Sequence, residues 1–226
     1  MIDVHAPHKS IGNTGEFFLH LFTITIGLLI AVGIEGCVGR YEHHKLAEEA
    51  RQTMRAEIRK NAKSADTALA DIEQEQKRNA DELASVQKIQ LTPNDPGSRD
   101  LNLSVNFDLV GFADTAWKTA QATGALGFMS YEEAERYSDI YDAEQVVERE
   151  QDQIAEDETQ MLGVAREVHP GKGGRLTAES ANMVAKQLGI IQGHLLTLKL
   201  AARLLQAEEE AFLQGKEAPR SLSATE

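Results

Sequence analysis

The side chains best able to hold a metal ion in this sequence are seven histidines, and their spacing argues against a shared site. His5 with His8, and His43 with His44, flank a hydrophobic run at its two ends, too far apart within one chain to share an ion. Neighbouring residues on a helix also point in different directions, whereas helical metal ligands stand about four residues apart. The sequence therefore predicts interfacial histidines, with no metal centre and no cofactor.

Paired carboxylates are the second candidate for chemistry. Glu144 and Glu148 stand four residues apart, so a helix would place them on one face, where they could bind a cation or exchange protons. The sequence around them is polar, and we expect no apolar surroundings that would shift their pKa values. The chain contains no glycine-rich phosphate loop, nucleophile elbow, metalloprotease motif or cysteine pair. We predict no catalytic residues and a protein that is not an enzyme.

The remaining ionisable residues form a dense acidic run. Residues 131–160 contain twelve carboxylates and two arginines, and the whole chain has a formal net charge of −13. Such a charge repels phosphate backbones and anionic headgroups, so we expect no binding to nucleic acid. A charge run of this kind is usually a solvated helix face. The only cysteine, Cys37, excludes a disulfide within the chain.

The element that must position the N-terminal residues is a hydrophobic helix. Residues 17–34 contain no Asp, Glu, Lys or Arg, and a helix of that length rises about 27 Å, close to the thickness of a bilayer core. We predict a short tail over residues 1–16 and a transmembrane helix over residues 17–38. A secretory or lipoprotein signal ending near Cys37 is the alternative, which the length of the run and the charged Glu35 disfavour.

One stripe of this predicted span carries small and polar residues at four-residue spacing: Thr23, Gly27, Ala31, Glu35 and Gly39. Small residues let helix backbones approach closely, so the stripe predicts oligomerisation or packing against a partner helix. A lone anchor that tolerates glycine is the alternative. Glu35, in the last turn of the span, is expected to reach interfacial water, and a carboxylate in an ion path is its alternative role.

The orientation in the membrane depends on the charges that flank the span. Lys9 precedes it, whereas Arg40, Lys45, Arg51 and Arg55 follow it. Basic flanks favour the cytoplasmic side, so we predict a cytoplasmic C-terminal domain. A periplasmic domain is the alternative, because large domains cross membranes largely regardless of charge.

Residues 39–216 are predicted to form an acidic, all-α soluble domain. No glycine or proline interrupts residues 40–91, so the membrane helix is expected to continue as a long stalk. Alternation of apolar and polar residues over 101–109 indicates a strand or an extended strap. Further helices are predicted at about 112–123, 131–169 and 178–214, folded as an antiparallel bundle or coiled-coil hairpin, with a disordered tail at 217–226.

The last two helices have apolar seams of different quality. In the third helix, one heptad position is apolar throughout, but its companion position is half polar, with Tyr137, Glu144, Gln151, Glu158 and Ala165. The fourth helix has the stronger seam, broken only by Glu209. We expect its packing residues to include Leu188, Ile191, Leu195, Leu198 and Leu205.

Four further residues are expected to matter for packing. Gly189 and Gly193 stand on one face of the fourth helix, where each costs about 1 kcal/mol relative to alanine, so we expect close packing against a neighbour there. His194, one position before the seam, is predicted at the edge of the core. Trp117, the only tryptophan, is predicted to anchor the helix at 112–123.

Two stretches of the sequence are distinctive: EFFLHLFTITIGLLIAVGIEG, and DTAWKTAQATGALGFMSYEEAERYSDIYD with Trp117, Gly124, Leu126 and Tyr131. Both resemble stretches of single-pass bacterial membrane proteins of unknown function. The resemblance implies a bacterial inner-membrane setting and contributes no catalytic residue.

We therefore expect a membrane-anchored structural or accessory subunit. Its partners would be the lipid bilayer and either further copies of itself or other membrane-protein subunits. A signalling or sensory module, which relays ligand or partner binding through the helices, is the alternative suggested by the half-polar seam. An ion-conducting helix oligomer that uses Glu35 is a third hypothesis.

Overall fold

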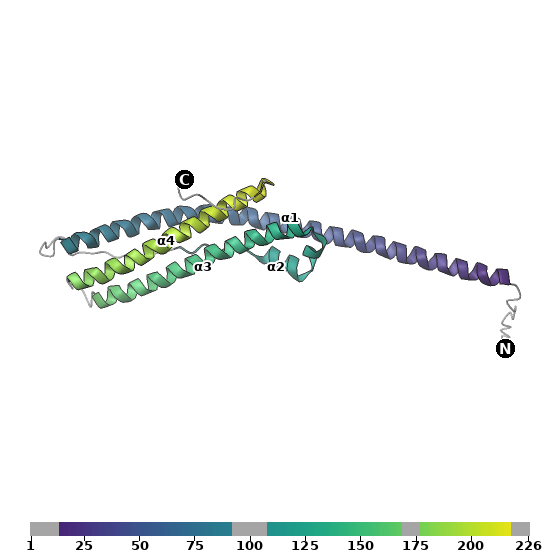
Figure 1. The fold of residues 1–226 in the computed structure, drawn as a ribbon, viewed down its shortest axis with the longest axis horizontal. Helices are drawn as coiled ribbons and strands as arrows, with labels where there is room; N and C mark the ends of the chain where they lie inside the picture. The colour runs from purple at the N-terminus through teal and green to yellow at the C-terminus, as the bar shows by residue number, and fades with distance from the viewer. Residues whose placement is uncertain (1–13, 92–107, 169–176, 218–226) are drawn as a thin grey trace, which may run out of the picture. The chain divides into compact units, whose positions relative to one another are not determined.

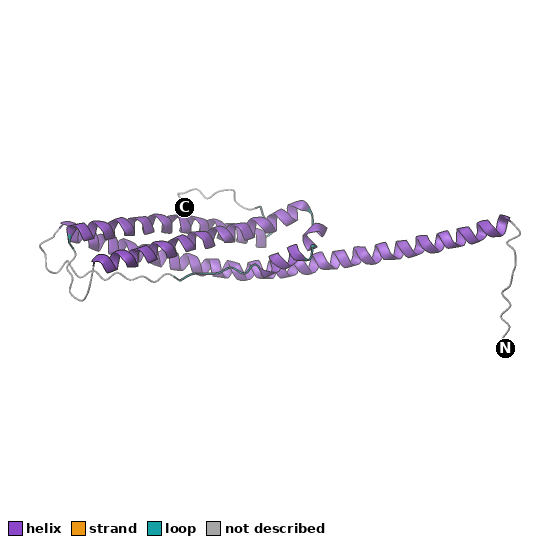
Figure 2. Cartoon of the chain, turned by 90° about the horizontal axis from the view of Figure 1, so that it is seen from below, coloured by secondary structure: helices purple, strands orange, loops and turns teal. Residues whose placement is uncertain are grey.

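The computed structural model describes residues 14–91, 108–168 and 177–217, and the protein is all-α, as predicted. No strand occurs in these three ranges (Figure 2). The chain divides into two compact units, Met1–Glu49 and Ala50–Glu226. The helices, labelled in Figure 1, are α1 (Thr14–Leu91), α2 (Thr115–Ala122), the 3₁₀ helix η2 (Ala125–Phe128), α3 (Tyr131–Val168) and α4 (Ala178–Leu213).

In the first unit, every described residue belongs to α1. Its apolar segment is fully exposed, and by length and composition it is a candidate membrane span. The hydroxyls of Thr23 and Thr25 donate hydrogen bonds to carbonyls one turn earlier, so neither needs water as a partner. Helix α4 also passes the test of length and composition, although part of it is buried in the second unit.

In the second unit, the C-terminal part of α1 lies beside α3 and α4 (Figures 1 and 2). Three–four spacing explains the arrangement, because residues so spaced share one helix face. The core of the unit consists mainly of aliphatic side chains from these three helices, among them Ala65, Ile72, Val86, Val147, Ile154, Met161, Val184 and Ala202. All five predicted packing leucines and isoleucines of α4 are buried: Leu188, Ile191, Leu195, Leu198 and Leu205.

Capping residues mark the start of α3 and α4 and the end of α2. Ser130 Oγ accepts a hydrogen bond from the Glu133 amide at 3.2 Å, and Thr177 Oγ1 accepts one from the Ser180 amide at 3.1 Å. Side-chain caps of this kind satisfy amides that have no partner within the helix. Gly124 follows α2 with a φ of 72°, the left-handed conformation that suits a glycine.

The segment before α2 differs from the prediction. The helix expected from residue 112 begins at Thr115, and residues 108–114, here called the strap, run without regular structure. Most of the alternating segment 101–109, the turn with Pro170, and the predicted tail beyond residue 217 lie outside the described residues. The strap is kept out of the helix because its backbone groups bond to side chains of α1 and α3.

Candidate functional site

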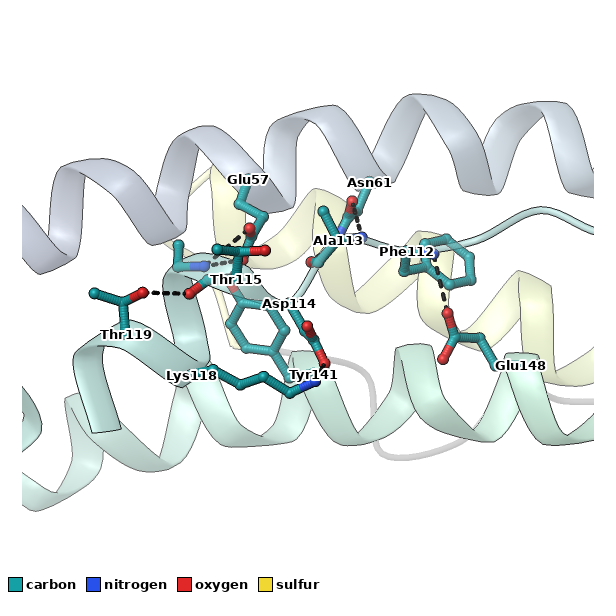
Figure 3. A network of polar contacts seen from close by, with 11 residues as sticks. Glu57, Asn61, Phe112, Ala113, Asp114, Thr115, Lys118, Thr119, Tyr141 and Glu148 are labelled. Carbon is teal, nitrogen blue, oxygen red and sulfur yellow. Dashed lines mark hydrogen bonds and ion pairs between the residues drawn. The ribbon is translucent and has the colours of Figure 1, made fainter. Parts of the chain in front are cut away.

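The strap is held by two side-chain amides. Each of them forms hydrogen bonds with both the backbone N–H and the backbone carbonyl of one strap residue. Gln151 of α3 accepts from the Val110 amide at 2.8 Å and donates to the Val110 carbonyl at 2.9 Å. Asn61 of α1 accepts from the Ala113 amide at 3.0 Å and donates to its carbonyl at 2.7 Å (Figure 3). Backbone groups that leave water need such partners. The strap is thus recognised through its backbone.

Two carboxylates extend this network (Figure 3). Glu148 accepts from the Phe112 amide at 3.0 Å, so this predicted acid–base candidate instead fixes the strap. Glu57 of α1 accepts from the Ala116 amide at 3.0 Å and from the Tyr141 hydroxyl at 2.9 Å. The network therefore joins the first turn of α2 to both neighbouring helices.

Trp117 packs on the same network. Its ring stacks on Tyr141, with centroids 5.2 Å apart and 17° between the planes. Trp117 itself is half-buried, whereas Tyr141 is fully buried. Burial and the hydrogen bond to Glu57 raise the pKa of Tyr141. The tryptophan thus lies against α3 through an aromatic stack.

Two glutamates lie inside the core near the strap. Glu144 is 2% exposed and Glu209 is 1% exposed. Asn61 Nδ2 donates to Glu144 Oε1 at 2.8 Å, but Glu209 Oε1 has no hydrogen-bond partner among the described residues. Burial raises the pKa of Glu144 to about 8 and that of Glu209 to about 9. Burial therefore shifts both carboxyls toward the protonated form.

Among the described residues that act on these two glutamates, none is a basic side chain that offsets the burial. The groups that act on Glu144 besides Asn61 are the carboxylates of Glu57, Glu148 and Asp114, and those that act on Glu209 are Glu144, Asp66 and Glu208. Each raises the pKa further, because a like charge disfavours ionisation. The expectation that nothing would shift the pKa of Glu144 was wrong. Its place in the heptad, rather than its polar neighbours in sequence, decides its burial.

A second buried pair of carboxyls lies further along the bundle. Glu158 of α3 is buried, and this raises its pKa to about 7. Glu75 of α1 forms an ion pair with Arg78 one turn later, yet burial still raises the pKa of Glu75. Desolvation therefore outweighs the attraction of the arginine. At the half-polar heptad position predicted for the third helix, Tyr137, Glu144, Gln151 and Glu158 are buried, whereas Ala165 is half-buried.

Other polar contacts tie α4 to its neighbours. Asn79 of α1 donates to the Leu188 carbonyl at 3.0 Å and to Gln192 Oε1 at 2.8 Å. His194 Nδ1 contacts Asp157 Oδ2 of α3 at the edge of the core, where the sequence placed this histidine. Among the described residues, no group of three or more His, Cys, Asp or Glu side chains is arranged to hold a metal ion. His5 and His8 lie outside those residues.

The outward side of α4 is apolar. We define the outer face of α4 as Gly189, Ile190, Gly193, Leu196, Thr197 and Leu200, all exposed and none charged. Leu196 is 55% exposed, Leu200 is 44% and Ile190 is 37%. The corresponding outward positions of α3 carry polar or charged side chains, with Val146 as the exception between residues 138 and 160. Those of α1 between residues 59 and 88 carry polar residues and alanines.

The two glycines of this face have no packing neighbour in the described part of the chain. A Cβ atom added at Gly189 or Gly193 would meet no described atom within 4 Å. The close neighbour predicted for them is therefore not a described part of the same molecule.

The residues of the predicted membrane stripe lie on the exposed part of α1. Thr23, Gly27, Ala31 and Glu35 are exposed, and Gly39 is half-exposed. Added Cβ atoms at Gly27 and Gly39 would likewise meet nothing described within 4 Å. Their role in oligomerisation stays a prediction.

Two features of the second unit are thus not needed to pack an apolar core. One is the set of buried polar residues, among them Glu144 and Glu209, here called the polar seam, and the other is the outer face of α4. Sequence periodicity contained the signal for both, since a heptad count places Glu144 and Glu209 inside and Leu196 and Leu200 outside. The chain matches no protein-family model, no curated protein and no solved structure.

Proposed function

We propose that the protein is a membrane-anchored accessory subunit that docks onto a partner protein through the outer face of α4. The observation that carries this proposal is the contrast between the helices of the bundle. Helices α1 and α3 turn mostly polar side chains outward, with Val146 and Leu162 as separate exposed apolar residues of α3. By contrast, α4 exposes Ile190, Leu196 and Leu200 together around two glycines. Contiguous exposed apolar residues of this kind mark interaction surfaces.

The apolar segment of α1 supports the anchor. It is exposed throughout, and it is long and apolar enough to span a bilayer. The resemblance to bacterial single-pass proteins and the basic residues after the span favour an inner-membrane protein whose C-terminal domain is cytoplasmic. The small-residue stripe with Gly27 and Ala31 would add helix contacts inside the membrane.

The first experiment combines membrane extraction with mass measurement. The full chain should stay with membranes washed at alkaline pH, and mild detergent should release a particle heavier than one chain and its micelle. Leu196→Glu should shrink that particle, because a carboxylate would have to be buried in the interface. Gln145→Glu, at an exposed outward position of α3, is the matched control and should leave the mass unchanged. Release by the alkaline wash, or a monomeric particle without companions, would contradict the proposal.

A second candidate function, a sensory module, is favoured by the buried carboxyls. Glu209 has an unpartnered oxygen inside the core, beside Glu144. Removing a proton from either group would place an uncompensated charge in an apolar interior, which disfavours the packed bundle. A rise in pH, or a partner that stabilises the charge, would then loosen the contact between α3 and α4.

Hydrogen exchange of the full chain in detergent distinguishes this second function. Amide protection in α3 and α4, corrected for intrinsic exchange rates, should fall as the pH rises through the pKa values of Glu144 and Glu209. Amide protection that does not change over this pH range would contradict the hypothesis of a sensory module, while the docking proposal would stand.

A further inference from the structure

We infer that the partner covering the outer face of α4 is a second copy of this chain, which makes the protein a homodimer through α4. This inference rests on the proposed docking function and names its partner. The contact would be isologous, with the same six residues contributed by each copy.

The first argument is electrostatic. Each copy has a formal charge of −13, and residues 131–160 of α3 carry twelve of its carboxylates. By contrast, α4 has no Asp or Glu between Glu179 and Glu208. Two copies that met through α3 would repel each other, whereas two that met through the middle of α4 would keep their acidic helices apart. The outer face of α4 therefore repels a second copy less than the acidic face of α3 does.

The basic residues near this face do not oppose the contact. Lys199 Nζ lies 2.9 Å from Glu73 Oε1 of α1, and Arg203 lies 3.5 Å from the same oxygen. Their charges are thus directed toward α1 rather than toward the outer face. Lys186 stands outside the six residues, at the N-terminal end of the face.

The second argument is chemical and steric likeness. Thr197 donates its hydroxyl hydrogen bond to the Gly193 carbonyl of its own helix at 3.4 Å, so the face presents no polar side chain that requires a complementary partner group. Gly189 and Gly193 leave open space beside the protruding Leu196 and Leu200. A surface of glycines and leucines fits an identical surface, since small residues allow close approach and large ones fill the remaining space.

The third argument is concentration. A proposed anchor on every chain confines all copies to one bilayer, which raises their effective concentration for each other above that of any soluble partner. The predicted stripe with Gly27 and Ala31 would act in the same direction. A modest apolar face is then sufficient for association.

Cysteine cross-linking in membranes tests the inference. The native thiol is removed by Cys37→Ala, and Thr197→Cys places a single thiol on the outer face. A short bifunctional thiol reagent should give a product of twice the 24.8 kDa chain mass. Gln145→Cys, exposed on α3, is the control and should give little product. Adding Leu200→Glu to the Thr197→Cys chain should lower the cross-linked fraction by at least about tenfold, because two buried leucines are replaced by carboxylates.

The possible failures are distinguishable. A Thr197→Cys product that contains a different protein would overturn the second copy as partner, while the docking function would survive. A thiol at position 197 that forms no product, but is shielded from a water-soluble maleimide only when bilayer is present, would show that lipid covers the face and would overturn the inference. A thiol that is freely labelled in a monomeric, companion-free particle would overturn both the inference and the proposed function. Far-ultraviolet circular dichroism of each variant checks that the helices are retained.

Discussion

The most informative single substitution is Glu209→Gln. Glu209 is 1% exposed, its Oε1 has no partner among the described residues, and burial raises its pKa to about 9 from an ordinary value of 4.5. Because the folded state holds this proton more tightly than the unfolded chain does, the free energy of unfolding must fall as the pH rises between these two values. Glutamine has a similar shape and no titrating proton, so it removes this dependence.

The size of the effect follows from linkage. Each pH unit between the two pKa values changes the free energy of unfolding by about 1.4 kcal/mol for one fully linked proton. Relaxation of the bundle and entry of water would reduce this, so we expect a difference on the order of 1 kcal/mol per pH unit between the wild type and Glu209→Gln. From about pH 5 to about pH 8 the variant should gain roughly 3 kcal/mol relative to the wild type. Glu144 keeps its own dependence in both proteins.

Denaturant titration of the full chain in detergent, at a series of pH values, measures this difference. Trp117 is the only tryptophan and stacks on Tyr141, so its fluorescence reports the second unit. Glu210→Gln, at the exposed next position, is the matched control and should follow the wild type. Parallel pH profiles for the wild type and Glu209→Gln would refute the reasoning, since they would mean that the carboxyl is not held protonated in the folded core.

Three further substitutions test separate contacts by the same titration. Asn61→Ala removes both hydrogen bonds to the Ala113 backbone and the donor to Glu144. It should lower the free energy of unfolding by about 1–3 kcal/mol and alter Trp117 fluorescence; an unchanged spectrum would contradict the strap contacts. Thr177→Ala removes the cap of α4 and should cost about 1 kcal/mol, whereas Thr177→Ser should retain most of the stability. Leu195→Ala should cost about 2–5 kcal/mol because its side chain is buried, whereas Leu196→Ala in a monomeric state should change stability by less than about 0.5 kcal/mol; equal effects would contradict the assignment of inner and outer faces.

Periodicity predicted most of the fold. The apolar seam of α4 and the long uninterrupted helix follow from three–four spacing and from the lack of glycine and proline, and these are local properties. The start of α2 at Thr115 could not be predicted, because it depends on the long-range bonds of Asn61 and Gln151 to the strap. Helix propensity in residues 112–114 is overridden by those contacts.

The candidate site was harder to predict for a related reason. Glu209 was taken as a break in the seam, but in the structure it keeps its heptad position and is buried there. A sequence pattern predicts the direction of a side chain but not the groups that face it. The lack of a hydrogen-bond partner for the Glu209 oxygen therefore could not be predicted. The close neighbour predicted for Gly189 and Gly193 is absent from the described part of the chain, so packing at these glycines stays a prediction.

The polar seam also bears on how the bundle selects one alignment of its helices. We infer that Asn61 sets the register of α1 against α3, because a shift by one heptad would bring Ala68 to its place. Glu144 would then lose its hydrogen-bond donor, and Ala113 would lose both of its backbone bonds. The aliphatic residues of the seam would lose packing contacts in such a shift but no hydrogen bond, so the polar contacts add to the preference for one register. A single register presents the outer face of α4 in one arrangement, which an isologous contact requires. Asn61→Ala should therefore populate more than one folded arrangement, visible as lifetime components of Trp117 fluorescence that the wild type lacks. A decay and an unfolding transition that match those of the wild type would argue against this role.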